Sequence, residues 1–123
     1  MLERVIRNLV VNAIEHADGT DVTIQVASTD TDVACRVRDR GVGMTQEVAD
    51  HVFDRFYRAD TARARTTGGT GLGLAIATED VAIHGGRLQA YGEPGKGASF
   101  LMTLPKHAGD EIASWPLALW EDE

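Results

Sequence analysis

The stretch Gly68-Gly69-Thr70-Gly71-Leu72-Gly73-Leu74 lies past the middle of a chain of 123 residues and leads directly into an apolar run, Ala75-Ile76-Ala77. Glycine has no Cβ, so a loop rich in glycine lets the backbone approach a bulky anion such as a phosphate. A helix that begins where the loop ends points its unpaired N–H groups and the positive end of its dipole at the same place. The stretch therefore indicates an anion site. Glycines that serve only to reverse the chain would give the same pattern.

Two common phosphate loops do not fit this stretch. It lacks the Gly-Lys-Ser/Thr sequence of a Walker loop. The Gly-x-Gly-x-x-Gly loop of a dinucleotide-binding domain follows a strand, whereas residues 58–67 are polar and have no strand pattern. A nucleotide site at this position would therefore be of another kind.

The composition narrows the function and the location. The net charge of −7, from 12 basic and 19 acidic residues, argues against a nucleic-acid surface, which needs a basic stripe. The sequence has no long apolar run and no secretory pattern at its N-terminus, so we expect no membrane contact by this segment and a cytoplasmic location. The single cysteine, Cys35, lies in an alternating run and predicts a buried structural thiol in a reducing compartment.

Residues 2–17 have the periodicity of a core-facing helix. The apolar stripe consists of Leu2, Val5, Ile6, Leu9 and Ala13. A neighbouring face of the helix carries Asn8, Asn12, Glu15 and His16. Asparagine is a poor helix former, but its amide oxygen is a good ligand for Mg²⁺ that already carries triphosphate oxygens. Hydrogen bonding to nearby backbone is the alternative explanation.

Alternating apolar residues predict two β-hairpins. Strands at residues 22–27 and 33–38 would form the first, with Val22, Ile24 and Val26 on a buried face. Strands at residues 88–91 and 99–104 would form the second.

A carboxylate and two glycines follow the first hairpin. Asp39 could accept a hydrogen bond from an exocyclic amino group such as that of adenine, and Gly41 and Gly43 would let a flat ring lie close to the backbone. An ordinary Asp-Gly turn is the alternative. Residues 46–52 could then form a short helix capped by Thr45.

The segment Phe53-Asp54-Arg55-Phe56-Tyr57-Arg58 combines aromatic anchors with arginines. An arginine held by such anchors can reach a terminal phosphate. Residues 59–67 are polar without a core-facing period, which indicates a flexible lid.

A second long helix is expected to begin in the glycine stretch and to end near His84-Gly85-Gly86. Its predicted apolar stripe consists of Leu72, Ala75, Ile76, Ala82 and Ile83. The order helix, hairpin, lid, helix, hairpin predicts an α+β fold, a two-layer α/β sandwich with helices on one face of a mixed, mostly antiparallel sheet. We expect one domain over residues 1–106, and a tail over residues 107–123 that packs on the domain or on a partner.

Four of these segments resemble, in order, the N, G1, F and G2 boxes of sensor histidine kinases. They are Asn8-Leu9-Val10-Val11-Asn12-Ala13, Asp39-Arg40-Gly41-Val42-Gly43, Phe53-Asp54-Arg55-Phe56-Tyr57-Arg58 and Gly69-Thr70-Gly71-Leu72-Gly73-Leu74. The resemblance implies the ATP-binding catalytic domain of the Bergerat fold, without the strands that precede the first helix in family members. The same fold occurs in gyrase-type ATPases, Hsp90 and anti-sigma-factor serine kinases.

The resemblance also implies the site residues, with ATP and Mg²⁺ as cofactors. Asn12 and Asn8 would hold Mg²⁺, and Asp39 would receive the adenine amino group beside Gly41 and Gly43. Arg58 would stabilise the γ-phosphate. The phosphate contacts would come from Gly69, Thr70, Gly71, Leu72 and Gly73. Two positions depart from the family pattern: Glu15 stands where a basic residue is common, and His16, expected in the cofactor site, stands where an aromatic is common.

The N box also separates the relatives from one another. Gyrase-type, Hsp90-type and anti-sigma-type members place a glutamate general base four residues before the metal-binding asparagine, and this chain has Asn8 there. Neutral imidazole needs no base to act as an acceptor, so the resemblance implies transfer to histidine. No histidine in the chain fits the phosphoacceptor pattern. The implied partners are a histidine-bearing dimerisation domain, on the same full-length protein or a separate chain, and a downstream response regulator.

Two alternatives stay open at the level of sequence. One is a protein serine kinase of the anti-sigma type. The other is a nucleotide-binding regulatory module without catalysis, which Glu15 and the short N-terminus would suit. In the favoured reading, the chain is cytoplasmic by itself or as the cytoplasmic part of a membrane-anchored kinase.

Overall fold

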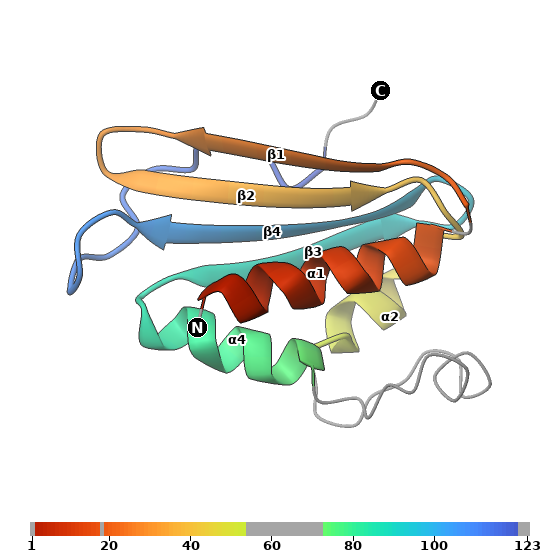
Figure 1. The fold of residues 1–123 in the computed structure, drawn as a ribbon, viewed down its shortest axis with the longest axis horizontal. Coiled ribbons are helices and arrows are strands. Elements are labelled where there is room, and N and C mark those ends of the chain that lie inside the picture. The colour runs from red at the N-terminus through yellow and green to blue at the C-terminus, as the bar shows by residue number, and fades with distance from the viewer. Residues whose placement is uncertain (1, 18, 54–72, 121–123) are drawn as a thin grey trace.

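The computed structural model describes residues 2–17, 19–53 and 73–120 and gives the chain an α+β fold. The elements are α1 (Leu2–Ala17), β1 (Val22–Ser28), β2 (Asp32–Asp39), α2 (Gln46–His51), α4 (Gly73–Ile83), β3 (Arg87–Glu93) and β4 (Gly97–Pro105). The strands form one sheet in the order β1-β2-β4-β3, and each pair among the described strands is antiparallel. Figure 1 shows the helices together on one face of this sheet. The predicted α+β fold with helices on one face is confirmed.

The core fills the space between α1, α4 and the helical face of the sheet. Side chains at every fourth position of α1 are buried, which is the spacing of one face of a helix. Alternate residues of β2 and β4 meet them from the sheet. The central cluster consists of Val5, Leu9, Ala13, Cys35, Val37, Ala77, Val81, Ala98, Phe100, Met102 and Leu104. Cys35 is buried, as the sequence predicted, and burial raises the pKa of its thiol.

The prediction of a buried apolar face on β1 holds only for Val22, which is partly buried and packs against the core, and is wrong for the other two residues. Ile24 is 50% exposed and Val26 is 69% exposed. The physical reason is that β1 is the edge strand farther from the helices (Figure 1). The central cluster is built from α1, α4, β2 and β4 and includes no residue of β1. Ile6 of the predicted α1 stripe is also 37% exposed.

The predicted stripe of α4 is only partly correct. Ala75 is buried as expected, but Ile83 is 73% exposed and Ala82 is exposed as well. The core-facing positions are instead Ala77 and Val81, which lie one turn apart and pack in the central cluster. The helix ends as predicted: Gly85 has a φ of +76°, and the N–H of Gly86 bonds to the carbonyl of Val81 at 2.9 Å.

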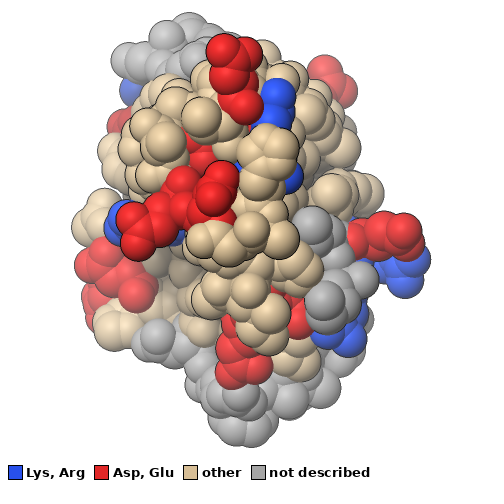
Figure 2. Space-filling model, turned by 90° about the vertical axis from the view of Figure 1, so that its left-hand side faces the viewer, with Lys and Arg blue, Asp and Glu red and all other residues tan. Residues whose placement is uncertain are grey.

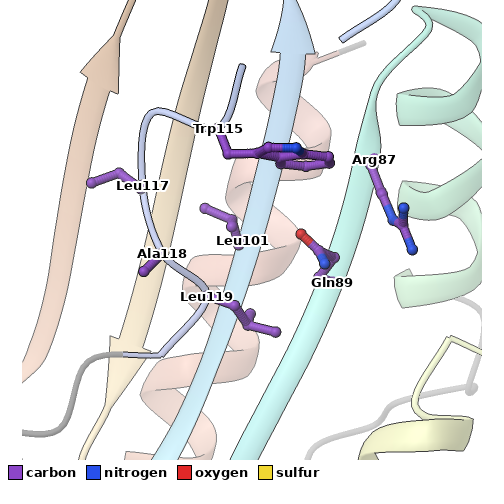
Figure 3. A pocket seen from close by; sticks show the side chains of 7 residues that line it. All are labelled: Arg87, Gln89, Leu101, Trp115, Leu117, Ala118 and Leu119. Carbon is purple, nitrogen blue, oxygen red and sulfur yellow. The ribbon is translucent and has the colours of Figure 1, made fainter. Parts of the chain in front are cut away.

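The tail after Pro105 packs on the domain, on the sheet face opposite the helices. Asp32, at the start of β2, accepts hydrogen bonds from the N–H groups of Ala113 and Ser114 at 3.1 and 2.7 Å. Further along β2, Arg36 donates to the carbonyl of Ala118 at 2.7 Å. We call residues 113–120 the C-terminal strap. Figure 3 shows part of it running over the sheet.

Candidate functional site

Helices α1 and α4 lie side by side and run in opposite directions (Figure 1). Arg4, near the start of α1, forms an ion pair with Asp80, near the end of α4, at 2.7 Å. Both helices rise by about 1.5 Å per residue, so the start of α4 at Gly73 lies beside the half of α1 that carries Asn12. The geometry therefore brings the end of the glycine stretch to the asparagine-bearing part of the first helix. The remainder of that stretch, from Gly69 to Leu72, lies outside the described residues.

The two asparagines of the N box occupy the rim of the helical layer. Asn8 and Asn12 are half-buried, one turn apart, and flank the fully buried Leu9 and Ala13. The side chain of His16 lies outside the described part of the chain. Among the described residues, no three His, Cys, Asp or Glu side chains gather as a metal site. Amide oxygens are neutral ligands, so this donor set fits a Mg²⁺ ion whose charge is balanced by phosphate oxygens.

Asp39 ends β2 at the same end of the molecule as the end of α1 and the start of α4 (Figure 1). Its side chain is completely buried, at 0% exposure. One carboxylate oxygen, Oδ1, accepts a hydrogen bond from the N–H of Gly41 at 3.0 Å. A buried carboxylate needs hydrogen-bond donors around it, and an amino group of a bound base would be one. The residue type and the burial both fit an adenine-reading side chain.

The loop after Asp39, residues 40–44, is fixed by the turn between β3 and β4. Gly43 has a φ of +75°, and a Cβ there would lie 2.0 Å from the carbonyl oxygen of Glu93. The carbonyl of Val42 accepts a hydrogen bond from the N–H of Gly95 at 2.9 Å. The sequence predicted that a flat ring would lie against the backbone of Gly43, where a side chain is missing. The structure shows that backbone of the β3–β4 turn fills this space.

Gly97 makes a second close approach to the same segment. A Cβ on Gly97 would lie 2.0 Å from the carbonyl oxygen of Asp39 and 2.7 Å from the Cα of Arg40. Gly92 is similarly enclosed, with Met44 Cγ at 2.7 Å from the position of an added Cβ. The sequence analysis gave Gly92 and Gly97 no role in the site. A glycine inside a strand often marks a close backbone contact, and that signal pointed here to the support of the Asp39 loop.

The residues predicted for the site thus fall into two groups. The structure brings the asparagine-bearing half of α1, the end of β2 and the start of α4 to one end of the molecule (Figure 1). Arg58 and the F box after Phe53 lie outside the described residues, together with Gly69, Thr70, Gly71 and Leu72. On the opposite end, acidic side chains outnumber basic ones among the described residues (Figure 2), and this excess of negative charge would repel a phosphate chain.

A separate pocket of about 240 Å³ lies on the other face of the sheet. Figure 3 shows it between the strap, which contributes Trp115 and Leu119, and strands β4 and β3, which contribute Leu101 and Gln89. The sheet separates this pocket from the helices that carry the predicted site. It is a gap under the strap and not the site that the sequence predicted.

Three features together indicate an ATPase-type domain. They are α1 with its two asparagines, the buried Asp39 at the end of β2, and α4, which begins at the end of the glycine stretch. Residues 1–108 match the family described as histidine kinase-, DNA gyrase B-, and HSP90-like ATPase. The chain belongs to this family. Among the described residues, no helix is both long and apolar enough to cross a membrane.

Sensor histidine kinases are the relatives that this chain resembles. It is 49% identical over 118 residues to the sensor histidine kinase MtrB of Mycobacterium tuberculosis, a match that covers 96% of this chain and 21% of MtrB. The chain therefore spans about a fifth of the length of this curated relative. Because 118 of 123 residues are matched, the similarity extends past Pro105 into the strap.

Two solved structures share the fold. Full-length ShkA in complex with AMPPNP superposes with a TM-score of 0.72 and 28% sequence identity, covering 88% of this chain and 22% of that one. The mycobacterial sensor histidine kinase MprB gives a TM-score of 0.69 with 28% identity, covering 83% of this chain and 68% of that one.

Proposed function

We propose that this chain is the ATP-binding catalytic domain of a two-component sensor histidine kinase and that it directs phosphoryl transfer to a histidine on a separate dimerisation domain. The observation that carries the proposal is the convergence of α1, the end of β2 and the start of α4 at one end of the molecule. The name of MtrB and the AMPPNP complex of ShkA support it. A response regulator would act downstream, and the domain would work in the cytoplasm.

Asp39 is the proposed adenine-reading residue. Its carboxylate is buried and one of its oxygens is held by Gly41, so it presents a fixed acceptor to the amino group of adenine. A hydrogen bond to a charged acceptor in a site without water is stronger than one between neutral groups. Gly41 would border the base, whereas the bare side of Gly43 faces the backbone of Glu93 and helps to fix the loop.

Asn8 and Asn12 are the proposed Mg²⁺ ligands, through their side-chain oxygens. ATP would supply the γ-phosphoryl group, together with the phosphate oxygens that complete the coordination of the metal. His16 would lie in the same cofactor site. By resemblance, Arg58 would stabilise charge on the γ-phosphate, and Gly69, Thr70, Gly71, Leu72 and Gly73 would contact the phosphates.

The proposed reaction needs no general base from this chain. The acceptor is a neutral imidazole with a free lone pair, and Asn8 stands where serine kinases and ATPases of the family are expected to have a glutamate. The catalytic contribution of the chain is then positioning and charge stabilisation.

Phosphotransfer to a supplied acceptor tests this proposal. The chain is mixed with Mg²⁺ and radiolabelled ATP, and with a separately produced helical hairpin that carries the phosphoacceptor histidine of an MtrB-type kinase. We expect acid-labile, base-stable label on the hairpin, as phosphohistidine gives, and no label when that histidine is replaced by glutamine. Label on a serine would establish the anti-sigma type of activity. Binding of ATP with no transfer to any acceptor would contradict catalysis and favour a regulatory nucleotide-binding module.

A further inference from the structure

The C-terminal strap follows β2 along its length, on the side away from the helices. Its contacts fall on alternate residues of that strand: Asp32 at the start, then Arg36, then Arg38 at the end. Alternate residues of a strand share one face. The strap is therefore attached along the strand whose last residue is Asp39.

The last residues of the strap meet β2 next to Asp39. The guanidinium carbon of Arg38 lies 3.8 Å from the centre of the Trp120 ring, and the ring of Tyr91 packs edge-on against the same indole at 5.0 Å. Arg38 is 8% exposed. A guanidinium stacked on an indole is most stabilising where water is excluded, so this contact fixes the end of β2 as well as covering it.

Arg38 and Ser99 then connect the strap to the strand pairing around Asp39. Arg38 also donates to the carbonyl of Lys96 in the β3–β4 turn, at 3.4 Å. In the register of β2 with β4, Arg38 stands opposite Ser99, whose hydroxyl donates to the carbonyl of Leu119 at 2.6 Å. The strap thus holds both members of the residue pair that precedes Asp39 in the sheet.

We propose that the C-terminal strap is a positioning element for Asp39, acting through Trp120 and Leu119. This inference rests on the proposed adenine-reading function. A purely apolar segment could shield the same face of the sheet, but its contacts would not fix the position of β2 along its own axis. Two buried arginines must be matched by particular acceptors, because an unmatched buried charge is costly. These directional contacts hold β2 in one position relative to the strap, and they hold the carboxylate of Asp39, the last residue of the strand, in the same way.

The test compares two nucleotides that differ only in the group that Asp39 reads. ATP and purine riboside triphosphate, which lacks the 6-amino group, are titrated with Mg²⁺ into the 123-residue chain. We expect the wild type to prefer ATP by about tenfold or more, the value of a hydrogen bond to a charged group. In Trp120→Leu we expect this preference to fall below about threefold, with the affinity for purine riboside triphosphate unchanged.

Trp115→Leu is the matched control, because Trp115 is 53% exposed in the same strap and should keep the full preference. Arg38→Lys retains the charge but not the planar stacking group, and should lose the preference as Trp120→Leu does, which guards against a folding defect in either variant. If both variants keep the wild-type preference, or lose affinity for both nucleotides equally, the strap does not position Asp39. If the wild type itself shows no preference, adenine reading by Asp39 fails, and this inference fails with it.

Discussion

Gly95 and Gly97 belong to the same turn, and both have left-handed backbone, with φ values of +81° and +101°. Their surroundings differ. No atom lies within 4 Å of a Cβ added to Gly95, whereas a Cβ on Gly97 would lie 2.0 Å from the carbonyl oxygen of Asp39. The pair therefore separates the cost of the backbone conformation from the cost of crowding the proposed adenine site.

Replacing these glycines by alanine should give unequal losses of stability. Gly95→Ala should lower the free energy of unfolding by about 1 kcal/mol, the cost of a left-handed alanine. Gly97→Ala adds overpacking and should cost about 2–4 kcal/mol in all. Urea denaturation of both variants gives the two values. Equal losses would show that the turn yields at Gly97 and that the Asp39 loop is not tightly seated.

At the level of elements, the ion pair of Arg4 with Asp80 joins α1 to α4. The Arg4 side chain is 56% exposed and that of Asp80 is 9% exposed, so solvent screens the pair on one side. A double-mutant cycle with Arg4→Ala and Asp80→Ala should give a coupling of about 0.5–1 kcal/mol in the free energy of unfolding. A coupling near zero would mean that apolar packing alone sets the alignment of the two helices.

The attachment of the strap at Asp32 should depend on pH. Burial raises the pKa of Asp32. Hydrogen bonds from Thr31, Ser114 and Ala113 lower this pKa by more than burial raises it, so the pKa lies below its ordinary value. A carboxyl whose pKa is depressed in the folded state stabilises the fold above its unfolded pKa, and this contribution is lost as the pH falls through the folded value.

Thermal unfolding of the wild type and of Asp32→Asn between pH 7 and pH 3 measures this dependence. We expect the wild type to be the more stable protein at neutral pH, by a margin that is constant down to about pH 4 and narrows below it. Asp30→Asn, in the exposed part of the same turn, serves as the control and should show no such margin. A margin for Asp32→Asn that does not change with pH would rule out the carboxylate as the anchor of the strap.

At the level of the whole molecule, periodicity predicted the helices and hairpins because α1 and the central strands bury regular faces. Periodicity gave the wrong prediction for Ile24 and Val26. Their alternation is typical of a strand with a buried face, but they are exposed on the edge strand β1. The order of strands is set by long-range pairing between β2 and β4, which no local pattern encodes.

The sequence also did not predict that the sheet face opposite the helices is covered. Arg36 and Arg38 alternate with core residues and have the pattern of a solvated face, but they are 5% and 8% exposed. They are buried by carbonyl and ring contacts from residues more than 80 positions away. Of the candidate site, motif order predicted Asn12 and Asp39, whereas the close contact of Gly97 with the backbone of Asp39 can be seen only in the structure.

The central claim is that the end of the molecule where α1, β2 and α4 converge binds ATP with Mg²⁺. Calorimetric titration of ATP into the wild type, Asn12→Ala and Asp39→Ala, each with Mg²⁺ and with EDTA, tests it most directly. The wild type should bind more tightly with Mg²⁺ than with EDTA. Asp39→Ala should weaken binding about tenfold or more under both conditions, and Asn12→Ala should remove most of the gain from Mg²⁺. Wild-type affinity in both variants, with the same response to Mg²⁺, would contradict the account.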